Sequence, residues 1–222
     1  MTPSACSRQI CGSIGRAALA LTVLIALVGC SQQPPGALTI AAGNRNFNQT
    51  FVAAYHSQAL GGDSDIVLLD EAAKQALDGN PSDAPVRQVM RIRVLWNASR
   101  DLKADHTTSS NATLHWYVLG NTPATANDVI EYAGTAMAVL ESDGNQTICS
   151  VRGASMRMVA RRGSLHDPIG KASFKGMIHA SENPTKARQA LEEVRDTILA
   201  EAAVDDPAVR RPLADRASSM AR

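Results

Sequence analysis

Five histidines carry most of the acid–base and metal-binding capacity of this chain: His56, His106, His115, His166 and His179. No two of them have the spacing of metal ligands, and no H-E-x-x-H motif is present. His106 and His166 each stand next to an aspartate, but adjacent residues of an extended chain point in opposite directions, so we expect solvated loop residues there. His115 and His179 fall on the more polar sides of predicted strands, and they would share a site only if those strands pair.

Motifs for nucleophilic and phosphate chemistry are absent from the sequence, which contains no G-x-S-x-G, no S-x-x-K and no phosphate loop. The segment 61–65, Gly-Gly-Asp-Ser-Asp, has some character of a calcium loop, but it lacks the remaining spaced oxygens and the distal glutamate. We interpret it as a turn. The sequence therefore predicts no catalytic residue, no cofactor and no metal.

Positive charge is concentrated between residues 152 and 171. Arg157 and Arg161 lie there on a predicted strand, and alternation places them on the same face as Ser155. Two arginines on one face suit anionic lipid headgroups or an acidic cell-wall polymer, because a guanidinium binds phosphate and carboxylate groups well. The alternative is an ordinary solvated face of the sheet.

The N-terminal segment has the organisation of a secretory signal. Arg8 and Arg16 give it a positive start without an acid, and residues 17–28 form an uncharged, apolar run. This run is too short to cross a membrane as a helix, which takes about 20 apolar residues. It ends at Cys30 in the sequence Leu-Val-Gly-Cys.

This Leu-Val-Gly-Cys sequence resembles the lipobox of bacterial lipoproteins, with Leu27 and Gly29 at the expected positions before Cys30. The resemblance implies that the thiol of Cys30 receives a diacylglycerol, that residues 1–29 are removed as a signal peptide, and that the new amine is acylated. Two or three acyl chains hold a protein stably on a membrane. Ser31 stands where an aspartate would favour the inner membrane, so the resemblance implies the outer membrane of a Gram-negative cell, or otherwise the cell membrane.

Removal of residues 1–29 takes two of the 22 basic residues, which leaves 20 against 21 acidic residues and a formal net charge of −1. This balance argues against a nucleic-acid partner, which usually needs a basic excess. Cys6 and Cys11 are lost with the leader and Cys30 carries lipid, so Cys149 has no partner for an intramolecular disulfide. We expect Cys149 to be buried and unreactive.

Residue patterns predict strands and helices along the rest of the chain. Alternation predicts strands at 38–40, 89–96, 111–119, 135–141, 146–152 and 172–180, with helices at 46–60 and 70–77. Gly153 is expected to bend or bulge the strand 146–152 into its continuation at 155–161. The first of these helices follows from the four-residue spacing of Phe47, Phe51 and Tyr55. Asp143-Gly144 between two strands is typical of a tight hairpin turn, because that turn needs a positive φ.

A last helix is predicted at 184–203, after an Asn-Pro pair that is typical of a helix start. Its apolar stripe consists of Ala187, Leu191, Val194 and Ile198. We predict a single α+β domain over 38–203, an antiparallel sheet of five or six strands with this amphipathic C-terminal helix packed on it. Residues 30–37 are expected to form the lipidated cysteine and a tether, and residues 204–222 a disordered tail.

These features predict a membrane-anchored lipoprotein of the cell envelope with a non-enzymatic interaction or envelope-maintenance role. Its expected partners are the membrane, through the lipid on Cys30, and a cell-wall polymer or an envelope protein, with Arg157 and Arg161 as candidate contacts. The alternative is a carrier that holds a small apolar ligand in a pocket between the sheet and the C-terminal helix. An enzyme is a third reading, and it would require a convergent cluster of His, Asp and Glu side chains.

Overall fold

The computed structural model of the protein describes residues 35–42, 45–58, 61–80, 82–98, 110–167 and 169–205. These residues belong to one compact unit. The predicted leader 1–29 and Cys30 lie outside the described residues, as does the predicted tail 204–222 apart from Val204 and Asp205, which belong to the last helix.

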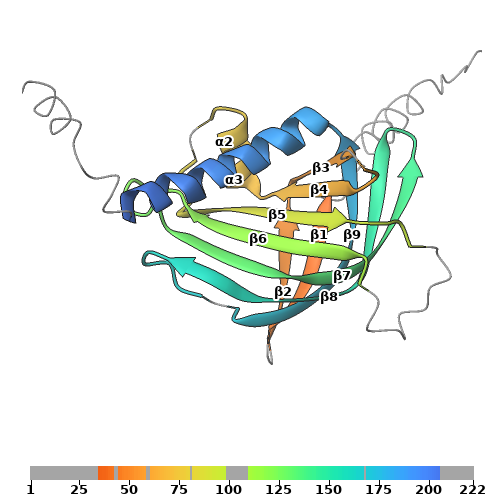
Figure 1. Cartoon of the computed structure of the whole chain (residues 1–222), viewed down its shortest axis with the longest axis horizontal. Coiled ribbons are helices and arrows are strands. Elements are labelled where there is room, and N and C mark those ends of the chain that lie inside the picture. Colours follow the sequence, from red (N-terminus) through yellow and green to blue (C-terminus); the bar gives the residue numbers. More distant parts are fainter. Residues whose placement is uncertain are drawn as a thin grey trace, which may run out of the picture. The chain divides into compact units, whose positions relative to one another are not determined.

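Strands and helices follow one another along the described chain as β1 Gly36–Ala42, β2 Arg45–Phe51, β3 Ala53–Gln58, β4 Ser64–Leu69, α2 Glu71–Leu77, β5 Val86–Val94, β6 Ala112–Gly120, β7 Val129–Asp143, β8 Gln146–Arg162, β9 Lys171–Glu182 and α3 Pro184–Asp205. The strands form one sheet in the order β2-β1-β9-β3-β4-β5-β6-β7-β8, and β8 also pairs with β9. The sheet therefore curves round and closes on itself, as Figure 1 shows. Neighbouring strands of the described chain are antiparallel except β3 and β9, which share a short parallel contact.

The inner face of the closed sheet forms the main core. Alternate residues of each strand point inward, and the fully buried side chains there include Leu38, Ile66, Ile92, Leu114 and Tyr132. The predicted α+β class and the mainly antiparallel sheet are confirmed. The predicted number of five or six strands is wrong, because the described residues form a sheet of nine.

Part of this difference lies at 46–60, where the chain forms β2 and β3 in place of the predicted helix. A four-residue spacing suits a helical stripe, but it also fits alternate positions of a strand. Pairing of β2 with β1, and of β3 with β4 and β9, decides for strands. The break at Val52 then separates the aromatic residues, with Phe51 in the inner core and Tyr55 in a cluster outside the sheet.

That outer cluster lies where α2 and α3 cover the outer face of the sheet (Figure 1). Asn183 begins α3, because its side-chain oxygen accepts the backbone N–H of Lys186 at 3.0 Å. Ala187, Ala190 and Val194 of α3 are buried against the sheet. These small side chains let the helix lie close to the strands.

The tight hairpin at Asp143-Gly144 is present between β7 and β8, and Gly144 has a φ of 59°. Further along, the pairing of β7 with β8 shifts register twice. Each shift inserts one extra residue into β8, Arg152 beside Gly153 and then Val159. Such bulges change which face of the sheet the following side chains occupy.

Candidate ligand-binding site

The two arginines that the sequence places on one face lie on opposite faces of the sheet. Arg157 is paired with Ala133, whereas Arg161 is paired with Ile130, a residue of the inner core. The extra residue Val159 lies between them, so a four-residue step no longer returns the chain to the same face. Both arginines are exposed, but the predicted face with two arginines is not formed.

His115 and His179 do not converge on one site. β6, which carries His115, pairs with β5 and β7, whereas β9, which carries His179, pairs with β1, β3 and β8. The Nδ1 atom of His115 lies 2.9 Å from a carboxylate oxygen of Glu131, and the imidazole stacks on the ring of Tyr117. His106 lies outside the described residues.

His56 lies where β3, β8 and β9 meet. It contacts an acid and a hydroxyl group, the partners that a histidine has in a catalytic triad, but their geometry differs from that of a triad. Its Nδ1 atom is 2.5 Å from Oε2 of Glu182 and 3.0 Å from Oγ1 of Thr147. A triad needs the acid and the nucleophile on opposite ring nitrogens. Here both contact Nδ1, while Nε2 is buried with no hydrogen-bond partner among the described residues. The contacts therefore join three strands at the closure of the sheet.

Within the described ranges, no group of three or more His, Cys, Asp and Glu side chains is placed to hold a metal ion. No helix of that part of the chain is long and apolar enough to span a membrane. Lipid attachment at Cys30 stays a prediction, because this residue lies outside the described ranges.

Cys149 lies in the inner core and is fully buried. Burial raises the pKa of its thiol to about 12, because the thiolate loses its hydration. The thiolate is the nucleophilic form of cysteine. The folded protein therefore presents an unreactive thiol, and we expect slow labelling by thiol reagents at neutral pH.

The raised pKa of Cys149 predicts an alkaline loss of stability. The folded pKa of about 12 lies above the ordinary thiol value of 9.0, so this contribution is complete below pH 9 and is lost as the pH rises towards 12. Its slope is about 1.4 kcal/mol per pH unit. Urea unfolding of wild type and Cys149→Ala from pH 8 to 11 should show the variant less stable at pH 8, with the gap closing above pH 9. A gap that stays constant would contradict the assignment.

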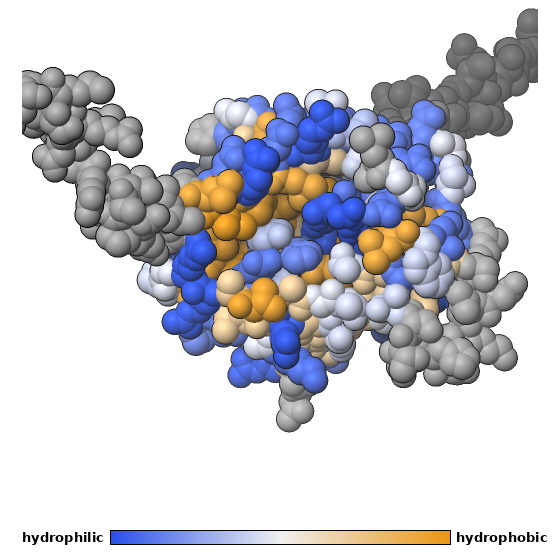
Figure 2. Space-filling model, in the orientation of Figure 1, coloured by the Kyte–Doolittle hydropathy of each residue, from blue (hydrophilic) through white to orange (hydrophobic). Residues whose placement is uncertain are grey.

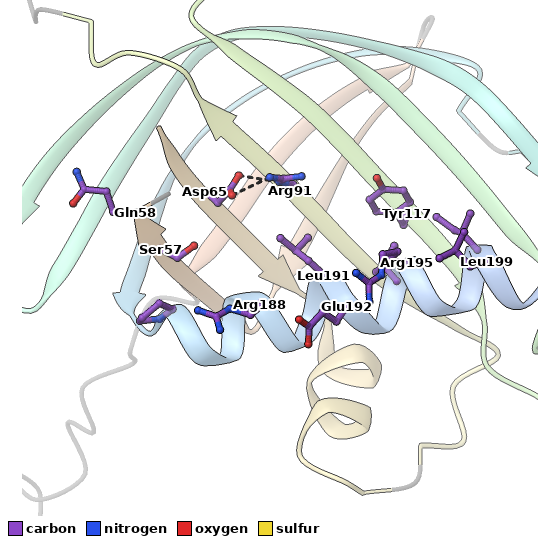
Figure 3. A pocket seen from close by; sticks show the side chains of 13 residues that line it. Ser57, Gln58, Asp65, Arg91, Tyr117, Arg188, Leu191, Glu192, Arg195 and Leu199 are labelled. Carbon is purple, nitrogen blue, oxygen red and sulfur yellow. Dashed lines mark hydrogen bonds and ion pairs between the residues drawn. The ribbon is translucent and has the colours of Figure 1, made fainter. Parts of the chain in front are cut away.

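A groove of about 600 Å³ runs along α3 on the outer face of the sheet (Figure 3). The alternative function predicted from the sequence, a carrier, would hold its ligand between the sheet and this helix. The apolar wall of the groove comes from α3 and consists of Leu191, Val194, Ile198 and Leu199. Figure 2 shows apolar side chains gathered beside this helix. Leu191 and Ile198 are only half-buried, so the larger members of the predicted stripe line the groove while the smaller ones pack on the sheet.

The two charged groups on the floor of the groove, Arg91 and Asp65, are already paired. Arg91 donates two hydrogen bonds to the two carboxylate oxygens of Asp65, at 2.8 and 2.9 Å (Figure 3). Tyr117 lies beside them, and burial, with a smaller effect of Glu131, raises the pKa of its hydroxyl to about 12. None of the described groove residues has a buried polar side-chain atom that lacks a partner.

A second cavity, of about 670 Å³, lies between the β1–β2 hairpin and the strands β5, β6 and β7. The loop 163–170, which joins β8 to β9, contributes to its wall. The apolar lining includes Trp116, Val118, Ile130, Leu165 and Ile169. The polar and charged lining consists of Arg45, Asn46, Gln49, Gln88 and His166. We call this space the inner cavity.

Strand pairing explains why these side chains face the inner cavity. Gln88 is paired with Val118, and Val118 is paired with Ile130 on its other side. Trp116 is paired with Met90, two residues along from Gln88. Directly paired residues of antiparallel strands point to the same side, so all of them project into the interior of the closed sheet.

Two polar atoms at the inner cavity lack a partner. The indole Nε1 of Trp116 and the amide Oε1 of Gln88 are buried without a hydrogen-bond partner in the described residues. Trp116 is only 2% exposed. A buried polar group left unpaired costs about 1–3 kcal/mol, so a donor placed against Gln88 and an acceptor placed against Trp116 would stabilise the protein.

The loop 163–170 is fastened to the strands by two carboxylates. Asp167 accepts the hydroxyl of the buried Tyr132 at 2.5 Å, together with two backbone N–H groups of the loop. Burial alone would raise the pKa of Asp167, but these hydrogen bonds hold it below its ordinary value. Asp128 accepts the backbone N–H and the hydroxyl of Ser164, at 2.9 and 2.7 Å. These bonds keep the loop at the wall of the inner cavity.

The sequence patterns did not identify Trp116, Gln88 or Arg45 as residues of a site. One signal for Gln88 was available. Continuing the alternation of Ile92 and Met90 backwards puts a polar glutamine on the apolar face of β5. No local pattern marks Arg45, because its place at the cavity depends on how the hairpin β1–β2 meets the rest of the sheet.

The closed sheet and the inner cavity define an α+β fold with a space of about 670 Å³ between the β1–β2 hairpin and the strands β5, β6 and β7. Comparison of the chain with protein-family models, with curated proteins and with solved structures finds no match.

Proposed function

We propose that this protein is a lipid-anchored protein of the cell envelope that binds a small, mainly apolar ligand in its inner cavity. The anchor rests on the resemblance of the sequence before Cys30 to a lipobox. The ligand site rests on one observation, an apolar wall that includes Trp116 and Ile130 and is joined by a few polar groups, with the buried polar atoms of Trp116 and Gln88 left without a partner. Sites for small molecules usually combine an apolar lining with a few polar groups of this kind.

The inner cavity supports ligand binding better than the groove along α3 does. Both have a volume that suits a small molecule, about 670 and 600 Å³. In the groove, however, the buried carboxylate of Asp65 is already satisfied by Arg91. The sequence favoured an interaction role and kept a carrier as the alternative, and the inner cavity favours that alternative at a different place in the fold.

Binding of the neutral dye Nile red tests this proposal. We expect the unlipidated mature chain, residues 30–222 in reducing buffer, to bind the dye saturably at one site. Val118→Trp should weaken that binding about tenfold or more, because the larger side chain fills space that the dye needs. Fluorescence titration measures the affinity, and circular dichroism checks that the variant is folded.

Leu191→Trp is the matched control, since it adds the same side chain to the groove along α3. It should leave the affinity for Nile red unchanged. If Leu191→Trp abolishes binding and Val118→Trp does not, the ligand site is the groove. Absence of saturable binding to the wild type would refute the carrier function itself.

A further inference from the structure

The charged groups at the inner cavity are all potential cations. Arg45 and His166 line it, and no aspartate or glutamate is among its described lining residues. Both residues are exposed, whereas Trp116 and Ile130 of the same cavity are buried. The cavity therefore has an apolar interior and a rim that carries positive charge.

Arg45 is available for a ligand. Its guanidinium has no hydrogen-bond or ion-pair partner among the described residues. Asp167, the acidic residue nearest in sequence to His166, directs one carboxylate oxygen at the hydroxyl of Tyr132 and at the loop backbone. It is therefore engaged in holding the loop and is not paired with Arg45.

From this arrangement we propose that the ligand is an anionic amphiphile, with its acidic group at Arg45 and its apolar part against Trp116, Val118 and Ile130. This inference rests on the proposed function and names the chemical class of its ligand. An arginine is suited to a carboxylate or a phosphate because its planar fork donates two parallel hydrogen bonds. The apolar tail gains by leaving water.

Three probes with chains of twelve carbon atoms, counting the carboxylate carbon of the acid, separate the contribution of charge from that of the chain. Dodecanoate is anionic, dodecan-1-ol is neutral and dodecyltrimethylammonium is cationic. In competition with Nile red on the unlipidated mature chain, dodecanoate should bind most tightly and the trimethylammonium compound most weakly. We expect the difference between these two to be about tenfold or more, since charges of opposite sign attract and those of like sign repel.

Arg45→Gln should lower the affinity for dodecanoate to that for dodecan-1-ol and leave dodecan-1-ol binding unchanged. Arg157→Gln is the matched control, because Arg157 is an exposed arginine outside the cavity lining, and it should change neither affinity. Increasing salt should weaken dodecanoate binding to the wild type more than binding to Arg45→Gln.

Failure of the ligand class and failure of the proposed function give different results. If all three probes bind equally well and Arg45→Gln has no effect, the cavity binds apolar ligands without charge preference and this inference is wrong. If none of the probes displaces Nile red and Val118→Trp leaves dye binding intact, the inner cavity is not the site and both proposals are overturned.

Discussion

Val194→Asp is expected to detach α3 from the sheet and to destabilise the domain by roughly 3–5 kcal/mol, a large share of the roughly 5–15 kcal/mol of an ordinary domain. Val194 is 3% exposed and packs in the outer cluster with Val67, Leu69 and Val89. The substitution removes apolar burial and leaves an unpaired carboxylate there. Urea unfolding followed by circular dichroism measures the loss, which should appear as a lower midpoint.

Leu199→Asp is the matched control on the same helix. Leu199 is 55% exposed, so the same substitution should change the free energy of unfolding by no more than about 0.5 kcal/mol. Leu191→Asp should fall between the two, because Leu191 is half-buried at the edge of the groove. A Val194→Asp protein as stable as the wild type would show that the sheet does not depend on its helical cover.

Cys30→Ala is expected to release the chain from the membrane or to leave it as an uncleaved precursor. The wild type should begin at Cys30 and carry added acyl mass, as the lipobox resemblance implies. Each buried methylene of an acyl chain contributes about 0.8 kcal/mol, so loss of two or three chains removes the anchor altogether. Mass spectrometry of the intact protein and fractionation of cells measure the two effects.

Cys149→Ala controls for a general effect of removing a thiol. Cys149 is buried in the core, so this variant should keep the acyl mass and stay with the membrane fraction. The anchor prediction is wrong if wild type carries no acyl mass and Cys30→Ala fractionates as wild type does.

Local patterns were enough to locate much of the sheet. The alternation around Ile92 and Leu114 marks β5 and β6, and Asp143-Gly144 marks the turn between β7 and β8. In each case the pattern and the structure depend on residues close together in the chain. β2 and β3 were missed because their spacing fits a helix equally well, and pairing with other parts of the chain made the choice.

The candidate site was less accessible to sequence reasoning, because its residues come from five strands and one loop. Trp116 and Ile130 are buried residues of the inner core, and only the closed sheet shows that a cavity remains beside them. For Arg157 and Arg161 the prediction was wrong in another way, because it grouped two residues that the structure separates. Their spacing indicated a shared face, but the extra residue Val159 in β8 places them on opposite faces. A glycine marks the bulge at Gly153, whereas no glycine marks the one at Val159.

The pairing of β9 also bears on when this protein folds. β9 borders β1, β3 and β8, and it pairs Gly36, at the start of β1, with Ile178, near its own end. The first strand of the domain therefore has no partner in β9 until most of the chain has been made. Contacts between such distant residues form slowly. The predicted signal peptide implies export of the chain in an unfolded state. The sheet cannot close until β9 is available, so the domain would stay incompletely folded until its last strand has crossed the membrane.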